Sequence, residues 1–233
     1  MFFFDPTYLM FMAPAFILML LTQWYVSSAY NKWSQVPAHT RLSGAQAAQR
    51  LLAASGLYNV RLLGIGGRMT DHYDPTSKEL RLSPGVAQSN SVAALAITAH
   101  ELGHALQDQE DYFPLRFRSV LVPVVNIGSY LGWIFIFLGL LMRWIDLAWL
   151  GVAVFSGGLL FALATLPVEF NASARARRLL ADSGMIVDSQ EAQGVNHVLN
   201  AAALTYVAAA VTAALQLLYY VFLVGGMGGR RRD

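Results

Sequence analysis

The chain has 233 residues, of which 56% are hydrophobic and only 13% are charged, about half the charged fraction of an ordinary soluble domain. Its formal net charge at pH 7 is +2, which is too small and too dispersed to indicate nucleic-acid binding. Cysteine is absent, which excludes disulfide bonds and any thiolate nucleophile or metal ligand. The composition therefore predicts a membrane protein without a nucleic-acid partner.

Four apolar stretches are long enough to cross the hydrocarbon core of a bilayer, which takes about 20 helical residues. These stretches are residues 8–28, 120–142, 147–166 and 201–224. The first lacks a basic start and a small-residue cleavage site, so we expect a retained anchor rather than a cleaved signal peptide. The pattern predicts a mainly α-helical membrane protein with about four transmembrane helices.

A polar segment, residues 30–118, follows the first apolar stretch and is large enough to form a small domain. Ser43 and Gln46 have the spacing of a capping box and predict a helix that continues to residue 54. Three stretches have the composition of strands: residues 59–63, 69–73 and 79–82. Asp74 and the proline after it favour a hairpin turn between the last two. An exposed strand edge can pair with an extended peptide, and a hairpin that only covers the core fits the pattern equally well.

The most informative motif is His-Glu-x-x-His at residues 100–104, within a stretch that predicts a helix over residues 91–109. His100 and His104 are four residues apart, so one helical turn brings both imidazoles to the same face, where they can bind one Zn²⁺. Glu101 lies beside the first ligand, where its carboxylate can accept a proton from a water that the metal activates. A helix with two hydrogen-bonded core histidines is the weaker alternative.

A catalytic zinc usually has three protein ligands and one open position, so a third ligand must come from elsewhere in the chain. Glu169 follows Pro167, where the third apolar stretch gives way to a polar segment. Because successive spans alternate sides, the segments after the first and third spans share one side of the membrane, and Glu169 can reach His100 and His104. Two alternatives remain: Glu169 is an acidic residue at a helix N-terminus, favoured by the helix dipole, or His72 is the ligand instead.

Several strings in the chain resemble the bacterial neutral zinc metallopeptidases of the YugP type, a family of membrane proteases. They are TDHYDP at 70–75, LRLS at 80–83, AHELGHALQ at 99–107, PLRFR at 114–118, TLPVEFNAS at 165–173 and LNAAALTYV at 199–207. The resemblance extends over residues 42–207. It implies a zinc-dependent endopeptidase of the bacterial inner membrane.

The string EFNAS at residues 169–173 is also distantly similar to the Glu-x-x-Ala-Asp element of HtpX and the CAAX prenyl proteases. In those membrane gluzincins the glutamate is the third zinc ligand, which implies the same role for Glu169. Ser173 stands where those enzymes have an aspartate that orients a ligand histidine. We therefore expect Ser173 or Asn171 to accept a hydrogen bond from an imidazole N–H.

From these residues we predict a membrane-embedded zinc metalloendopeptidase that hydrolyses peptide bonds of membrane or membrane-proximal polypeptides. His100, His104 and Glu169 are the predicted ligands of Zn²⁺, and Glu101 is the predicted general base. Four residues are left open as the group that stabilises the oxyanion: His197, Asn200, Tyr206 and Arg175. Two other classes remain as alternatives, a metal-binding membrane scaffold without turnover and an ion-transport protein with these residues at a midplane site.

The predicted fold is mainly α, with about four transmembrane helices and a small α+β zincin-like catalytic domain inserted between helices 1 and 2. The predicted segments are a first transmembrane helix (1–29), the zincin-like domain with its HExxH helix (30–118), transmembrane helices 2 and 3 (119–167), a helical segment with the third ligand (168–200), and transmembrane helix 4 with a basic tail (201–233). The expected partners are a polypeptide substrate, itself a membrane protein, and the lipid bilayer. A homo-oligomer or a regulatory membrane partner is left open.

The expected location is the bacterial inner membrane, which the chain crosses several times. Basic residues near the ends of the first three spans favour a cytoplasmic catalytic face by the positive-inside rule. These residues are Lys32, Arg116, Arg118, Arg175, Arg177 and Arg178. The start of the chain, residues 1–5, has no basic side chain, which agrees with this orientation. The opposite side has Arg143 and the three arginines at 230–232, and these three argue for the opposite orientation.

Overall fold

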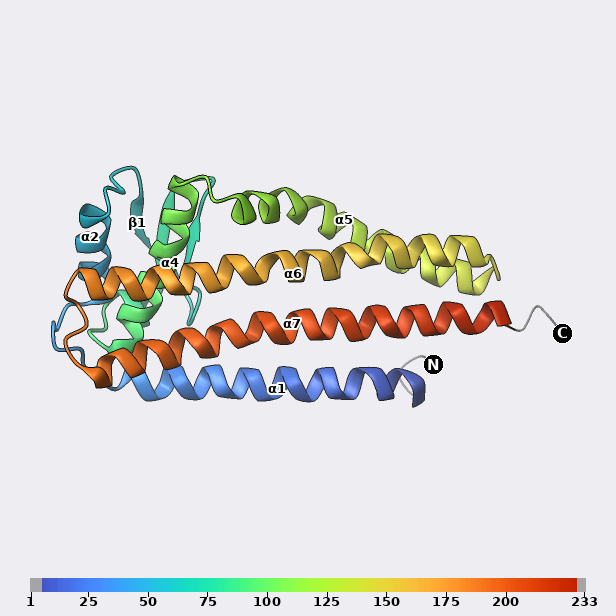
Figure 1. Cartoon of the computed structure of the whole chain (residues 1–233), viewed down its shortest axis with the longest axis horizontal. Helices are drawn as coiled ribbons and strands as arrows, with labels where there is room; N and C mark the ends of the chain where they lie inside the picture. Colours follow the sequence, from blue (N-terminus) through green and yellow to red (C-terminus); the bar gives the residue numbers. More distant parts are fainter. Residues whose placement is uncertain (1–5, 230–233) are drawn as a thin grey trace. The chain divides into compact units, whose positions relative to one another are not determined.

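The structure is a computed structural model that describes residues 6–229 (Figure 1). The start of the chain and the three arginines of the predicted basic tail lie outside the described residues. The chain divides into two compact units. Unit 1 lies within Met1–Thr22, Phe117–Leu166 and Thr205–Asp233, and unit 2 comprises Gln23–Arg116 and Pro167–Leu204.

Four helices among residues 6–229 are long and apolar enough to cross a membrane, as the sequence predicted. They are α1 (Pro6–Ser34), α5 (Phe113–Leu141), α6 (Ile145–Asp182) and α7 (Ser189–Gly229), which Figure 1 draws from blue to red. The predicted apolar stretches fall within these helices except for residue 142. The helices extend further than those stretches because apolar length predicts only the part suited to lipid, whereas backbone hydrogen bonding continues through polar residues.

In unit 1, α5 and α6 approach each other closely because glycines face the partner backbone. A Cβ added to Gly139 would lie 2.5 Å from the backbone nitrogen of Ala148, and one added to Gly151 would lie 2.6 Å from that of Ile136. Small residues at such crossings allow close packing of membrane helices, where no aqueous hydrophobic effect draws the helices together. The α5–α6 pair is therefore held by shape complementarity.

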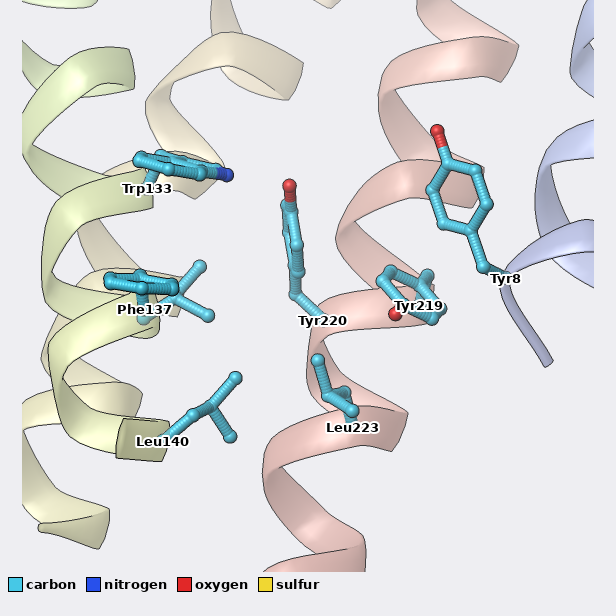
Figure 2. A pocket seen from close by; sticks show the side chains of 8 residues that line it. Tyr8, Trp133, Phe137, Leu140, Tyr219, Tyr220 and Leu223 are labelled. Atoms are coloured by element: carbon cyan, nitrogen blue, oxygen red, sulfur yellow. The ribbon is translucent and has the colours of Figure 1, made fainter. Parts of the chain in front are cut away.

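Unit 1 also contains an apolar cavity of about 250 Å³ (Figure 2). Its lining residues are Tyr8 of α1, Trp133, Ile136, Phe137 and Leu140 of α5, and Tyr219, Tyr220 and Leu223 of α7. None of these residues has a carboxylate or imidazole group, so the cavity does not offer the chemistry that the sequence predicts for hydrolysis.

Unit 2 contains a three-stranded sheet of β1 (Arg61–Gly64), β2 (His72–Asp74) and β3 (Glu79–Leu82), in the order β1-β3-β2. The strand β1 pairs with β3 in parallel, and β2 pairs with it in antiparallel orientation. The prediction for β3 is confirmed, whereas β1 and β2 begin later than predicted. Met69 has a φ of +56° and His72 is the first residue opposite β3, so the residues before it form a loop.

Two helices pack against the sheet, α2 (Gly44–Ala54) and α4 (Val92–Gln109), and the short α3 (Pro84–Ala87) packs against both of them. The predicted capping box of Ser43 and Gln46 is confirmed, and Ser91 caps α4 by accepting a hydrogen bond from the backbone N–H of Ala94. The α4 helix is buried on several sides and forms the centre of the unit 2 core, where Leu95 and Leu102 have no exposed surface. Such burial fixes the helix that bears the motif.

The α6 helix continues without a break through Pro167 and ends only at Asp182. Glu169 therefore lies in the interior of a long helix. The alternative that it is a carboxylate at a helix N-terminus, stabilised by the helix dipole, is wrong. The polar residues after Pro167 had suggested a new helix start, but helices of membrane proteins tolerate an internal proline when the freed backbone carbonyl finds other partners.

Candidate metal centre

The three predicted ligands lie together in unit 2, although 65 or more residues separate the two histidines from Glu169 in sequence. The α4 helix carries His100 and His104, and α6 carries Glu169 (α4 is green and α6 yellow to orange in Figure 1). The Nε2 atom of His100 lies 3.3 Å from Oε2 of Glu169, and Nε2 of His104 lies 3.5 Å from the same oxygen. Three donor atoms of types that zinc prefers thus converge.

The spacing of these donor atoms fits a metal ion between them. In a tetrahedral zinc site with bonds of about 2.0–2.1 Å, two neighbouring donor atoms are about 3.3 Å apart. A direct hydrogen bond between an imidazole and a carboxylate is shorter, about 2.7–2.9 Å. The separations from Glu169 to His100 and to His104, 3.3 and 3.5 Å, match the first geometry better.

Burial gives the centre a closed side and an open side. The side chain of Glu169 is only 2% exposed, whereas those of His100 and His104 are 12% and 13% exposed. A buried carboxylate is costly unless hydrogen bonds or positive charge compensate it. A divalent cation bound by these three residues would supply that charge, and the partly exposed imidazoles leave an approach from solvent.

Each imidazole is oriented by a contact at its other nitrogen. Nδ1 of His100 lies 3.3 Å from Oγ of Ser173, and Nδ1 of His104 lies 3.0 Å from Oε1 of Gln107. With a proton on Nδ1 donated to these oxygens, the lone pairs at both Nε2 atoms point toward Glu169. The expected contact of Ser173 with a ligand histidine is therefore present. Asn171 instead accepts a hydrogen bond from Gln107.

Gln107 is a residue that the sequence analysis missed. It is completely buried, and its amide nitrogen donates to the backbone oxygen of Val168 at 2.8 Å and to Oδ1 of Asn171 at 2.9 Å. A fully satisfied amide of this kind is fixed in position, so its oxygen holds His104 in turn. The signal in the sequence was a polar residue three positions after His104. Residues three positions apart are neighbours on the surface of a helix, so the two side chains can contact each other.

A close crossing of α4 and α6 brings the predicted ligands together. Gly103 lies between the ligand histidines and meets the backbone of α6, where a Cβ on Gly103 would lie only 2.5 Å from the carbonyl oxygen of Ala172. Ala172 is one helical turn from Glu169. The glycine therefore permits the approach that puts the glutamate within reach of both imidazoles.

Glu101 points toward the sheet, where its Oε2 accepts a hydrogen bond of 3.0 Å from the backbone N–H of Tyr73 on β2. Burial raises the pKa of Glu101 above the ordinary value of a glutamate, although the charges of His100 and His104 and the bond from Tyr73 oppose the rise. A carboxylate with a raised pKa accepts a proton more readily near neutral pH. The environment of Glu101 thus suits a general base.

The other candidates have different partners. Nδ1 of His72 lies 2.8 Å from the backbone oxygen of Thr70, and His72 is not one of the three converging groups. Three of the four oxyanion candidates are engaged elsewhere: Arg175 with Glu110 and Asn171, Asn200 with Arg177, and His197 with the indole N–H of Trp33. The fourth candidate, Tyr206, belongs to unit 1.

A second group of metal-binding residue types, His39, Asp188 and Glu191, also lies in unit 2. Its geometry has a structural explanation. The carboxylate of Glu191 accepts the backbone N–H groups of His39 and Val187 at 2.7 and 2.8 Å, while Asp188 caps the start of α7 by accepting the N–H of Glu191. This group ties a loop to a helix start and needs no metal to account for it.

Comparison with known proteins agrees with this chemistry. A family model described as "Putative neutral zinc metallopeptidase" matches residues 8–225. The chain is also 44% identical over 201 residues to "Putative membrane protease YugP" of Bacillus subtilis (strain 168), an alignment that covers 86% of this chain and 89% of the relative. No solved structure matches the chain at a significant level. The family match spans nearly all of the sequence, and the chain therefore belongs to the neutral zinc metallopeptidase family.

Proposed function

We propose that the protein is a zinc metalloendopeptidase in which His100, His104 and Glu169 hold Zn²⁺ and Glu101 is the general base. The observation that carries the proposal is the convergence of two Nε2 atoms on one oxygen of Glu169, at 3.3 and 3.5 Å, with both Nδ1 atoms engaged by orienting groups. The family description supports a peptide as the substrate.

When bound, Zn²⁺ at such a centre acidifies a water and polarises the carbonyl of a peptide bond. The remaining steps belong to Glu101. Its Oε2 is held by the N–H of Tyr73, which leaves Oε1 to accept the proton as the water oxygen bonds to the carbonyl carbon. Glu101 then returns that proton to the leaving nitrogen as the carbon–nitrogen bond breaks, and the products are a carboxylate and an amine.

The wider assignments of the sequence analysis belong to the same proposal. Residues 30–118 form a zincin-like catalytic domain, which residues 168–200 complete by supplying the third ligand. The substrate is a membrane or membrane-proximal polypeptide. The protein resides in the bacterial inner membrane with the catalytic face in the cytoplasm, which the basic residues near the ends of the first three spans support. A homo-oligomer or a regulatory membrane partner stays a prediction.

Specific features favour the peptidase over the two alternatives. A scaffold with a structural metal needs no base, yet Glu101 is partly buried beside the predicted ligands and one oxygen of its carboxylate is held by a hydrogen bond. An ion-transport site at the bilayer midplane requires the ligand helix to lie within a membrane span. The α4 helix, which carries His100 and His104, is not among the four candidate spans of residues 6–229.

The test compares the full-length wild-type protein, purified in detergent, with Glu101→Gln and Glu169→Ala. We expect one zinc per wild-type chain and hydrolysis of an unstructured protein substrate. Glu101→Gln should keep the zinc and lose hydrolysis by at least about 10²-fold, because the base is gone while the ligands remain. Glu169→Ala should lose zinc. A full complement of zinc in Glu169→Ala would remove Glu169 from the ligand set, and a wild-type rate in Glu101→Gln would refute the mechanism.

A further inference from the structure

We propose that Tyr73, Asp108 and Lys78 form a clamp that positions the general base Glu101. The proposal rests on the proposed function and adds three positioning residues to it. The clamp joins the β2–β3 hairpin to α4 and aims one backbone N–H at the carboxylate of Glu101.

Tyr73 binds α4 at two points. Its backbone N–H donates to Oε2 of Glu101 at 3.0 Å, and its phenol O–H donates to Oδ2 of Asp108 at 2.6 Å. Glu101 and Asp108 are seven residues apart, about two helical turns, so they lie on the same face of α4. Two bonds from one residue to positions two turns apart on a helix oppose sliding or rotation of the strand along that face.

Lys78, the last residue of the turn before β3, is the third member of the clamp. Its ammonium group donates to the same oxygen of Asp108 at 2.5 Å, and its φ of +54° belongs to the turn between β2 and β3. The carboxylate of Asp74 accepts the backbone N–H of Thr76 at 2.9 Å and the hydroxyl of Ser77 at 2.8 Å, which makes the turn rigid. Asp108 thus receives bonds from residues on both sides of a stiff turn.

The surroundings strengthen these bonds. Tyr73 is 9% exposed and the side chain of Asp108 is 16% exposed, so the charge-assisted bonds at Asp108 are only weakly screened by water. A glutamate side chain otherwise rotates about three bonds, and a misplacement of about 1 Å at a reacting group can cost about 10²-fold in rate. The clamp therefore acts on the position of Glu101 rather than on its identity as a base.

The clamp also defines which part of the strand edge is free. The N–H of Tyr73 points away from β3 and already donates to Glu101, so a peptide paired with β2 does not use this N–H. The hypothesis that an extended substrate pairs with this strand must therefore place the pairing at other backbone groups of the edge.

The first test measures amide hydrogen exchange at Tyr73 in the full-length protein in detergent, with and without zinc. Tyr73→Phe and Asp108→Ala should each speed exchange of this amide about 5–10-fold, the loss expected when one supporting hydrogen bond is removed. Glu101→Ala removes the acceptor and should speed the same amide. Tyr58→Phe is the control, because Tyr58 is 85% exposed, and should change nothing. Unchanged exchange at Tyr73 in both Tyr73→Phe and Asp108→Ala would overturn the proposal.

The second test is kinetic. Tyr73→Phe should lower kcat about 10-fold or more, with KM and zinc content unchanged, because the clamp touches neither substrate nor metal. The double variant Tyr73→Phe/Asp108→Ala should lose no more than the larger single loss, since both changes remove the same bond. Lys78→Met, which removes only the ion pair, gives a milder variant with a smaller kcat loss if Asp108→Ala does not fold. The clamp proposal would be overturned if Tyr73→Phe kept the wild-type kcat, or if this variant lost zinc.

These results separate the clamp from the proposed function. If the wild-type protein binds no zinc and hydrolyses no peptide, the proposed function fails and the kinetic role of the clamp falls with it. If the wild-type protein is active while Tyr73→Phe retains both its kcat and its slow exchange, only the clamp fails.

Discussion

At the scale of single residues, the candidate site consists of groups that the sequence predicted and of groups that hold them. His100, His104 and Glu101 were predicted from their spacing on one helical turn, and Glu169 from the alternation of spans. Gln107 and Tyr73 were not predicted, because an orienting contact depends on which side chains meet across two elements. Their roles depend on contacts with α6 and with α4, respectively.

Gln107 provides a prediction at this scale. Gln107→Ala should weaken zinc binding about 10–100-fold, because the imidazole of His104 loses the acceptor that fixes its tautomer and ring orientation. Competition with a chromophoric chelator measures the affinity directly and requires no substrate. Gln109→Ala is the matched control, since Gln109 is exposed at the end of the same helix. Equal affinity in wild type and Gln107→Ala would show that His104 is oriented without Gln107.

At the scale of elements, the decisive contact is the crossing of α4 and α6. The sequence predicted that both elements exist, but it placed a helix boundary near Pro167, where α6 in fact continues to Asp182. It also could not indicate that Gly103 faces another backbone, because a glycine within a helical pattern indicates only low helix propensity at that position. The close approach became visible only once Ala172 was seen opposite Gly103.

This crossing leads to a second prediction. Gly103→Ala adds a Cβ that would lie 2.5 Å from the carbonyl oxygen of Ala172, so α4 and α6 must move apart. We expect the free energy of unfolding to fall by about 1–3 kcal/mol, the usual cost of overpacking, and zinc affinity to fall with it. Thermal unfolding in detergent and chelator competition measure the two effects.

The control for this change is Gly66→Ala, which lies in a loop where an added Cβ meets no atom within 4 Å. Its stability and zinc affinity should stay close to those of the wild type. A gain of about 1 kcal/mol in Gly103→Ala, as helix propensity alone gives, would contradict the tight crossing.

At the scale of the whole molecule, composition and the lengths of the apolar stretches predicted a membrane protein with about four spans, and four candidate membrane-spanning helices are present among residues 6–229. The division into units was less predictable. Unit 2 combines Gln23–Arg116 with Pro167–Leu204, so the chain leaves it for α5 and the first part of α6 before it returns with Glu169. The sequence had treated residues 30–118 and 168–200 as separate segments.

Orientation in the membrane is a prediction at this scale. The chain has no cysteine, so Thr76→Cys in the exposed hairpin turn creates a single reporter. With the catalytic face in the cytoplasm, a membrane-impermeant maleimide should label this site only after the inner membrane is permeabilised. Met142→Cys, 64% exposed after α5, should show the opposite behaviour, because one span separates the two positions. Strong labelling of Thr76→Cys in intact cells would reverse the assignment.

The sequence by itself determined what is local or additive: the lengths of the apolar stretches, the capping box of Ser43 and Gln46, and a motif whose two imidazoles share a face through the pitch of a helix. Only the tertiary structure decided the rest. The meeting of Glu169 with His100 and His104 depends on two helices whose contact is set where Gly103 packs against Ala172, a residue far from Gly103 in sequence. Local sequence patterns determine the secondary structure of each segment, whereas the distances between segments depend on how their side chains pack against one another.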